Sequence, residues 1–375
     1  MAFNPPELIG ETQAFSLCGD WITRRRQYFA LYDRTGMPYR HSGFSSGRFR
    51  NAAEANPDLG RIRKKLGGPV LFAGQVSDQF GHVLLNSIGR LWALERLPDD
   101  TTLYYITKYQ LPRKKQLHRK HRHLQPVLDL FGIRNKVLIT RHSLQIDQAY
   151  LASDLFGEVH EGCGAPQFYA WIDRRLPPPG PVEPGRAVYV TRCRLGPGNG
   201  RFACEDHLER LLQDRGYTIF APEQHDLKTQ VETFQRAERL IFAEGSALHL
   251  YALVARPCQN VAVIHRRMEL PPLMINQLRD RPGHRVTVVN AVTDVYWPPK
   301  AGDHYSVSVI DFEQVKHALL KARLIDNARG WTEPSPADLQ ASLSAGLSPG
   351  EALLDEAARA EFKRDRRAAT AERRA

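Results

Sequence analysis

Short apolar runs alternate with longer amphipathic stretches along most of the chain. In the first half, apolar runs at residues 70–73, 103–107 and 137–140 predict strands. Apolar residues recur at helical spacing over 78–97 and 124–131, which predicts a helix in each stretch. Strands that alternate with helices indicate a doubly wound α/β sheet.

The same alternation restarts after a break rich in proline. Residues 177–185 contain five prolines and two glycines, which can continue neither a helix nor a central strand. We therefore predict a domain boundary there. Beyond it, strands are predicted at 187–191, 217–220, 240–243 and 260–264, and helices at 205–215 and 228–237.

The pattern at the two ends of the chain is weaker. Residues 1–66 mix aromatics, arginines and turn formers, which predicts short strands and loops. Beyond residue 330 the chain is rich in Ala, Glu and Arg and has little apolar content. The predicted organisation is a first domain at 1–176, a linker at 177–185, a second domain at 186–330, and an Ala/Arg-rich tail at 331–375 that is helical or disordered.

Composition and charge limit the class of protein. A hydrophobic content of 42% and a charged content of 25% are typical of a globular protein. The first residues lack the layout of a signal peptide, and no apolar run approaches the length needed to cross a bilayer. Five irregularly spaced cysteines fit neither a zinc site nor a disulfide framework. These features predict a cytoplasmic protein.

The net charge of +11 favours an acidic partner or surface. The densest basic cluster, at 113–122, has three interpretations. A solvated helix face is favoured first, and attraction to an anionic membrane surface second. Nucleic acid is third and is not expected, because aromatics do not alternate with these charges and no recognition-module pattern is present.

The stretch 239–249 holds the strongest local signal for a binding site. A buried strand at 240–243 is followed by a turn of small residues and by a helix that continues to residue 254. The first amides of such a helix have no intrahelical partner and favour a phosphate. The same pattern also occurs at βα turns that bind nothing.

Several polar residues near predicted strand ends are candidates for chemistry. His82 begins the helix after the strand at 70–73, and Asp78 lies four residues earlier; His82 either takes a proton from a hydroxyl or satisfies a backbone carbonyl. Arg192 follows a strand and either grips a diphosphate or lies exposed. Arg201 and Glu205 flank a helix start, and one interpretation is that they pair with one another. His249 either points at the phosphate or packs internally.

Missing motifs exclude other mechanisms. There is no Asp-x-Asp, the common metal clamp of enzymes that use nucleotide sugars. There is no Walker-type loop, which disfavours an NTPase.

In combination, the motifs resemble those of glycosyltransferase family 61, which includes bacterial capsular-polysaccharide proteins. The block 80–92, FGHVLLNSIGRLW, resembles the family's GH-x-L-L-(D/E)-x-x-x-R-L-W segment. The second half continues in the family's order, and the whole resemblance extends from about residue 69 to residue 297. The matching motifs there are Val190-Thr-Arg192, Arg201-Phe-Ala-Cys-Glu205, Gly216 with Pro222-Glu223, Leu227 and Gln230, Phe234 and Ala237, and Gly245-Ser-Ala-Leu-His249.

The resemblance implies a GT-B fold, in which two Rossmann-like domains face a cleft and the second holds a nucleotide sugar. It implies an inverting transfer without a metal or another cofactor, to a glycan or lipid-linked glycan acceptor bound by the first domain. By position in the motifs, the donor-binding residues are Arg192, Arg201, Glu223, Gly245, Ser246, Ala247 and His249, and His82 faces the acceptor.

The chain departs from the family pattern at three positions. Asn86 stands where the family often has an acid, which leaves Asp78 or His82 as the catalytic base. Cys204 replaces the usual Asn, and Gly89 stands where a proline precedes the arginine. The sequence thus predicts a hexosyl- or pentosyltransferase of capsule or surface-polysaccharide synthesis, cytoplasmic and peripheral at the inner membrane. The alternative is a non-catalytic protein of the same fold that binds a nucleotide sugar or polysaccharide.

Overall fold

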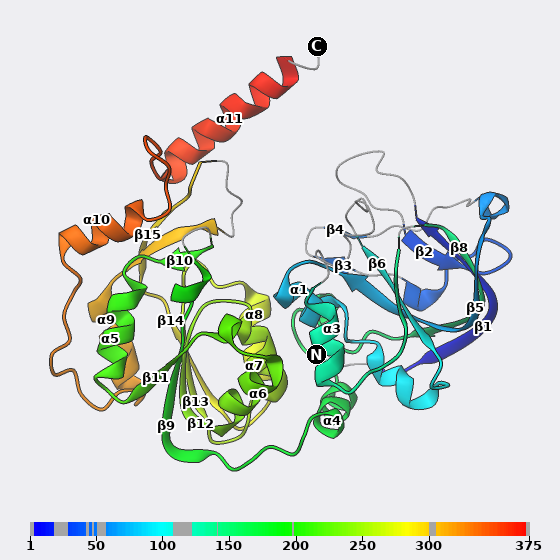
Figure 1. The fold of residues 1–375 in the computed structure, drawn as a ribbon, viewed down its shortest axis with the longest axis horizontal. Coiled ribbons are helices and arrows are strands. Elements are labelled where there is room, and N and C mark those ends of the chain that lie inside the picture. The colour runs from blue at the N-terminus through cyan, green and yellow to red at the C-terminus, as the bar shows by residue number, and fades with distance from the viewer. Residues whose placement is uncertain are drawn as a thin grey trace. The chain divides into compact units, whose positions relative to one another are not determined.

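The computed structural model describes residues 4–18, 29–42, 45–46, 49–50, 58–107, 122–140, 142–196, 199–299 and 305–372. The chain divides into two compact units. Unit 1 comprises residues 1–178 and 272–280, and unit 2 comprises 179–271 and 281–375. Each unit contains a sheet with parallel strands and helices (Figure 1), so the predicted α/β class is confirmed.

Unit 1 is built on a six-stranded sheet in the order β2-β1-β8-β5-β6-β7. Strand β1 pairs antiparallel with β2 and with β8, whereas β8, β5, β6 and β7 run parallel. The bounds are β1 Leu8–Cys18, β2 Phe29–Tyr32, β5 Lys64–Val76, β6 Thr102–Thr107, β7 Val137–Ile139 and β8 Leu144–Ala152. A separate short pair is formed by β3 (Ser45–Ser46) and β4 (Phe49–Arg50).

Strand β5 is much longer than the predicted strand at 70–73. Its N-terminal part is polar and contains Pro69, which argues against a central strand. The pairing of β5 with β8 shifts register between Leu66 and Pro69. A proline, which has no N–H to donate, is tolerated at such an irregularity.

The predicted helix at 78–97 is wrong as one continuous element. Helix α1 ends at Asn86 (Phe80–Asn86), and a separate 3₁₀ helix follows at Leu91–Arg96. Polar groups in the break have partners outside it: the Ser87 hydroxyl donates to the Gln75 carbonyl at 2.7 Å, and buried Arg90 pairs with Asp154 at 2.8 Å. Satisfying these buried groups outweighs continuing the helical ladder.

The remaining helices of unit 1 are α3 (Leu124–Leu130), α4 (Pro166–Arg175) and α8 (Pro272–Asp280). Helix α8 comes from the second half of the sequence and joins unit 1. Its last residue, Asp280, accepts hydrogen bonds from the Gly164 N–H at 2.7 Å and the Tyr169 hydroxyl at 2.6 Å. These bonds attach α8 to the N-terminal part of α4.

Unit 2 contains a five-stranded parallel sheet in the order β11-β9-β12-β13-β14. The bounds are β9 Glu183–Val190, β11 Tyr217–Phe220, β12 Ala237–Ala243, β13 Asn260–Ile264 and β14 Arg285–Val289. One face is covered by α5 (Glu205–Gln213) and α9 (Phe312–Lys321), whose buried side chains share a core with the sheet. The other face carries α6 (Leu227–Arg236) and α7 (Ala247–Val254), as Figure 1 shows. The sheet is therefore doubly wound.

A second, small sheet in unit 2 has the order β10-β16-β15. Its strands are β10 Arg201–Phe202, β15 Val292–Tyr296 and β16 Val307–Ile310. The chain beyond residue 330 forms α10 (Pro336–Ser344) and α11 (Glu356–Glu372). Trp331, at the start of this tail, is buried and donates its indole N–H to the Phe312 carbonyl at 3.0 Å.

The predicted linker overlaps strand β9. Helix α4 ends at Arg175, but β9 already begins at Glu183, two residues before the predicted linker ends. Pro184 and Gly185 fall where the pairing of β12 with β9 shifts register, between Ala237 and Arg239. The irregular pairing accommodates a residue that donates no hydrogen bond.

Candidate functional site

The strand order of unit 2 indicates where a ligand binds. The chain enters the sheet at β9, places β11 on one side of it, and then adds β12, β13 and β14 on the other side. In open parallel sheets, ligands bind at the carboxyl ends of the strands, where the order reverses in this way. Here that point lies beyond Val190 of β9 and Ala243 of β12.

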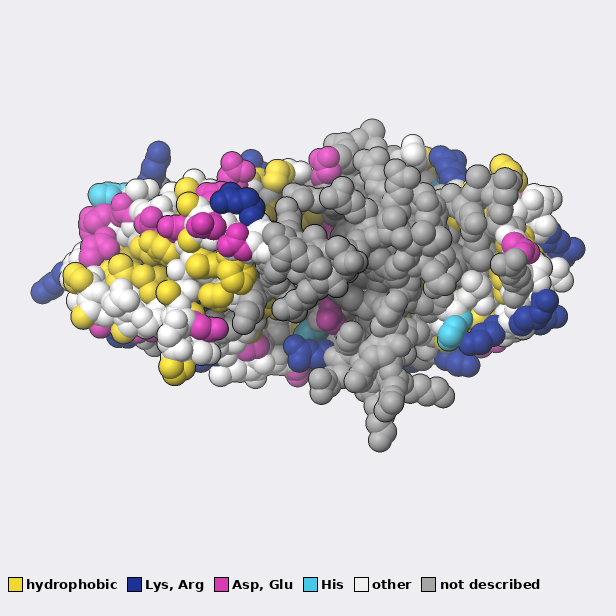
Figure 2. All heavy atoms as spheres, turned by 90° about the horizontal axis from the view of Figure 1, so that it is seen from above, with side chains coloured by type: hydrophobic (Ala, Val, Ile, Leu, Met, Phe, Trp, Pro, Cys, Tyr) yellow, Lys and Arg dark blue, Asp and Glu magenta, His cyan; other side chains and the backbone are white. Residues whose placement is uncertain are grey.

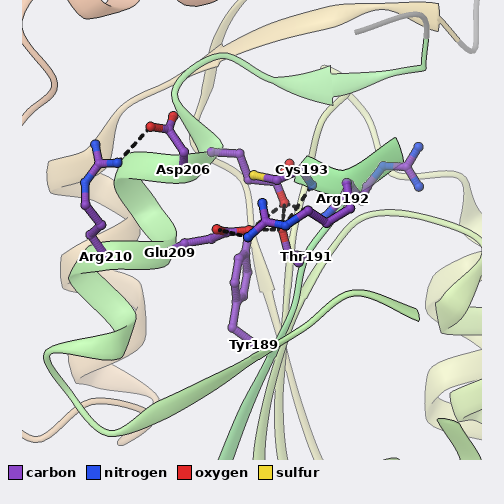
Figure 3. Close-up of polar contacts among 9 residues, drawn as sticks. Tyr189, Thr191, Arg192, Cys193, Asp206, Glu209 and Arg210 are labelled. Atoms are coloured by element: carbon purple, nitrogen blue, oxygen red, sulfur yellow. Dashed lines mark hydrogen bonds and ion pairs between the residues drawn. The ribbon is translucent and has the colours of Figure 1, made fainter. Parts of the chain in front are cut away.

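Two glutamates of α5, Glu205 and Glu209, contact the residues at the end of β9. Figure 3 shows Glu209 beside Thr191. Glu205 Oε1 accepts hydrogen bonds from the Tyr189 hydroxyl at 3.0 Å and from the Arg192 backbone N–H at 2.8 Å. The Thr191 hydroxyl lies 2.6 Å from Glu209 Oε1 and 3.1 Å from Glu205 Oε1. Burial raises the pKa of Glu205, while the Arg192 N–H opposes the rise. The two carboxylates fix the backbone from which the Arg192 side chain extends.

The Arg192 guanidinium lies over the turn that follows β12. Its Nε and Nη2 donate to the Gly200 carbonyl at 3.0 and 2.9 Å. Its Nη1 faces Gly245, because a Cβ built on Gly245 would lie 2.3 Å from that nitrogen. Burial lowers the pKa of Arg192, and the nearby Glu205 and Glu244 oppose the change. Glycine at 245 is what allows the guanidinium this close to the backbone.

The same turn presents backbone donors. The N–H groups of Gly245 and Ser246 make no hydrogen bond within the described part of the chain, and they directly precede α7. The N-terminus of a helix carries partial positive charge and favours an anion. Together with Arg192 Nη1, these amides form a candidate site for a phosphate.

Ala247 and His249 belong to α7, beside that site. His249 is buried, at 5% exposure, which fits the internal packing that the sequence left open. Glu223 lies in the 3₁₀ helix Pro222–Gln224 after β11, where it is exposed and its charge acts on Arg192.

Arg201 follows Gly200, whose carbonyl Arg192 contacts, but its own side chain makes other hydrogen bonds. Its Nη2 donates to the carbonyls of Ser342 at 2.9 Å and Ala345 at 3.2 Å, at the end of α10. The sequence left open a pairing of Arg201 with Glu205, but no hydrogen bond joins them among the described residues. Burial lowers the pKa of Arg201, and the charge of Glu205 opposes this change. Its position indicates a role in holding the tail helix.

His82 of α1 forms a dyad that the sequence did not reveal. Its Nδ1 lies 2.8 Å from Oε1 of Glu158, whose side chain is 8% exposed, while the His82 side chain is 35% exposed. A carboxylate at this distance selects the tautomer that carries the proton on Nδ1. The other ring nitrogen, Nε2, then has a free lone pair to accept a proton.

Glycine at 157 permits this dyad. Gly157 precedes the 3₁₀ helix Glu158–His160 with φ of 108°. A Cβ built on it would lie 1.8 Å from the Leu85 carbonyl oxygen of α1. The backbone of the loop therefore packs directly on α1, which brings Glu158 to His82 across 76 positions of sequence.

Asp78 is not part of the dyad. No hydrogen bond or ion pair joins it to His82 among the described residues; its charge acts on His123 instead, where it opposes the lowering of the histidine pKa by burial.

The sequence analysis also did not identify Glu209, nor the three residues His265, Arg266 and Arg267 that follow β13. Glu209 lies one helical turn after Glu205, a spacing that was available in the sequence. The residues after β13 follow a predicted strand, so the rule on strand ends applied to them as well.

The described residues include only part of the surface on which partner binding was predicted. Most of the basic cluster at 113–122 lies outside the described residues, with Arg122 at its described end. Figure 2 shows Lys and Arg side chains in small separate groups over the described part of one face. In the described part of the chain, no helix is long and apolar enough to cross a membrane. Among these residues there is also no group of three or more His, Cys, Asp or Glu suited to a metal ion.

Comparison with known proteins supports the resemblance found in the sequence. Residues 80–262 match the family model described as Glycosyltransferase 61. This range includes α1 with His82, the dyad partner Glu158, and the strands β9 and β12 with Arg192 and Gly245. No curated protein matches the chain. The resemblance is thus confirmed over this range.

Proposed function

Because residues 80–262 carry the glycosyltransferase family 61 region, we propose that the chain transfers a sugar from a nucleotide-sugar donor to a glycan or lipid-linked glycan acceptor. The single observation that carries this proposal is the anion site of unit 2. Arg192 Nη1 lies against Gly245, and the amides of Gly245 and Ser246 precede α7, at the edge where the strand order reverses. A diphosphate has the charge and the acceptor oxygens that these donors require.

The proposed reaction is a one-step inversion. The acceptor oxygen attacks the anomeric carbon, the bond from that carbon to the phosphate oxygen breaks, and the electron pair leaves with the nucleoside diphosphate. Negative charge therefore develops on the phosphate, where Arg192 and the α7 amides stabilise it. With these groups in place, no metal is required in the proposed mechanism.

In this mechanism His82 is the base. Its Nε2 takes the proton of the acceptor hydroxyl as the new bond forms, and Glu158 stabilises the imidazolium that results. Asp78, the other candidate base, lacks a comparable partner among the described residues. The assignment rests on the 2.8 Å contact between His82 and Glu158.

The finer family properties are part of the same proposal. They are a GT-B arrangement with the donor bound by unit 2 and the acceptor by unit 1, hexosyl or pentosyl transfer, and a role in capsule or surface-polysaccharide synthesis. We also propose that the protein works in the cytoplasm, beside the inner membrane.

A thermal-shift screen followed by a transfer assay tests the function. The full chain is melted with UDP-, GDP-, CMP- and dTDP-sugars, each with and without EDTA. A ligand that binds the folded state raises the melting temperature by mass action. We expect one nucleotide class to raise it equally with and without EDTA, and Arg192→Ala to abolish the rise.

Arg210→Ala is the matched control, because Arg210 pairs with Asp206 on the surface of the same unit. Release of nucleotide only in the presence of a glycan acceptor would demonstrate transfer. Tight binding without any release of nucleotide would favour the alternative of a non-catalytic binding protein. If millimolar nucleotide sugar shifts no melting curve, the donor site is wrong.

A further inference from the structure

A group of titratable side chains follows β13, beside the anion site. Strand β13 is the neighbour of β12, and the two end level with one another, with Ala243 opposite Ile264. Glu244 follows β12, and His265, Arg266 and Arg267 follow β13. These last three residues lie just past the stretch matched by the family model, which ends at 262.

Glu244 connects the two strand ends. Its side chain is fully buried; Oε2 accepts the backbone N–H of Arg266 at 3.1 Å, and Oε1 lies 3.1 Å from Nε of Arg267. The Arg267 side chain is 33% exposed. A carboxylate with no solvent contact thus holds an arginine that a ligand can reach.

Arg266, by contrast, is held from several sides. It is 4% exposed, its Nη1 lies 3.4 Å from the Ser306 hydroxyl, and its carbonyl accepts the Ser308 hydroxyl. This residue is therefore a fixed source of positive charge, while Arg267 is the member that can change partner.

The charged groups at this edge act on one another. Burial lowers the pKa of Arg266 to about 10; Arg267 and Arg192 add to the lowering, and Glu244 and Glu205 oppose it. The three guanidiniums are therefore close enough to interact, and an anion bound among them is favoured by their charge.

His265 adds an unsatisfied polar group. Its side chain is 5% exposed and lies close to the Arg267 backbone, but neither ring nitrogen makes a hydrogen bond of ordinary geometry within the described residues. His265 therefore adds a buried polar group on the Arg267 side of this edge.

We propose that Arg267, which the structure pairs with Glu244, forms a second oxyanion subsite beside the Arg192 site. The subsite takes one oxyanion group of the donor, either the second phosphate or a carboxylate on the transferred sugar. This inference rests on the proposed function. Glu244 competes with the ligand for Arg267, so it weakens the binding of anions while it holds the arginine in place.

Calorimetric titration of the full chain with inorganic pyrophosphate and with inorganic phosphate tests the subsite without any nucleoside. If the second phosphate occupies it, Arg267→Gln weakens pyrophosphate binding about tenfold and phosphate binding by less than about threefold, since one charge-assisted contact is lost. Glu244→Gln tightens pyrophosphate binding several-fold, because the competing carboxylate is gone. Arg210→Gln is the control and changes neither.

Titration with UDP-glucuronate and UDP-glucose separates the two sources of the oxyanion. If the sugar carboxylate occupies the subsite, Arg267→Gln weakens the binding of UDP-glucuronate about tenfold more than the binding of UDP-glucose, and it leaves the affinity for pyrophosphate unchanged. Melting curves without ligand verify that each variant is folded.

The inference is overturned if Arg267→Gln affects no ligand more than the control does. It is also overturned if Glu244→Gln weakens binding as much as Arg267→Gln, the result expected of a purely structural ion pair. Transfer by the wild type does not enter these comparisons, so failure of the subsite and failure of the proposed function are separate results.

Discussion

At the scale of single residues, the His82–Glu158 dyad gives the mechanism its sharpest test. If His82 accepts the proton, as proposed, His82→Gln lowers kcat by about a hundredfold or more with little change in KM for the donor. Glu158→Gln keeps an oxygen for Nδ1 but removes the charge, so kcat should fall about tenfold to a hundredfold. Steady-state transfer kinetics measure both effects.

Asp78→Asn distinguishes the two candidate bases in the same assay. It should leave kcat within about threefold of the wild type, because Asp78 has no contact with His82 in the described structure. A loss of kcat in Asp78→Asn with full activity in His82→Gln would assign the base to Asp78 instead.

Glu205 predicts a dependence of stability on pH. Burial raises its pKa, so the folded chain holds the proton to a higher pH than the unfolded chain does. Its contribution to stability is therefore fully present below the ordinary glutamate range and is lost as the pH rises through the raised pKa. Glutamine cannot ionise and keeps an acceptor for the Arg192 N–H.

The expected result is that Glu205→Gln gains melting temperature relative to the wild type as the pH increases from about 4 to 8. Melting curves of both proteins at several pH values measure the difference, and other titrating groups cancel in it. A difference that does not vary with pH would mean that Glu205 ionises as it does in the unfolded chain.

At the scale of elements, glycine positions decide how closely loops approach helices. Gly157→Ala places a Cβ against the Leu85 carbonyl at a residue whose φ is 108°. We expect a loss of about 2 kcal/mol or more in unfolding free energy, from backbone strain and from the displaced loop. Because the loop carries Glu158, kcat should also fall about as far as in Glu158→Gln.

Gly132→Ala is the matched control for this change. Its φ is 67°, also left-handed, but nothing lies within 4 Å of the added Cβ. It should cost about 1 kcal/mol from its backbone conformation and leave kcat unchanged. If Gly157→Ala and Gly132→Ala lost equal activity, the loss in Gly157→Ala would not result from displacement of Glu158 from His82.

The elements also show what local sequence can predict. Strands β11 and β13 were predicted to the residue, because short apolar runs between turns leave few alternatives. The break after α1 was missed because it depends on Asp154 and Gln75, which lie in other elements. Strand β8 was missed for a similar reason: its exposed and buried residues alternate irregularly, and its partners β1 and β5 determine it.

Some residues of the candidate site could likewise be predicted from the sequence, and others could not. Arg192, Gly245 and Ser246 were predictable, because each lies within three residues of the end of a strand and the strand ends share one edge of the sheet. Glu158 was not, since its approach to His82 depends on the packing of Gly157 on α1. Arg201 was assigned to the donor by its place in a motif, but its hydrogen bonds lead to α10.

At the scale of the whole molecule, Arg201 and the tail test whether residues beyond 330 stabilise unit 2. Arg201 donates to the last carbonyls of α10, and the Cys204 N–H donates to the Ser342 hydroxyl at 2.8 Å. Charge-assisted bonds of this kind contribute about 1–2 kcal/mol, so Arg201→Gln should lower the melting temperature by roughly 2–6 °C. Deletion of residues 336–375 should lower it by at least as much.

The combination of the two changes is the decisive measurement. If Arg201 acts through α10, Arg201→Gln in the shortened chain lowers the melting temperature no further, because its partners are already gone. The same variant in the full chain should then bind nucleotide sugar as the wild type does. If Arg201→Gln instead weakens that binding about tenfold with or without the tail, Arg201 contacts the donor as its motif position suggests, and its bonds to α10 are secondary.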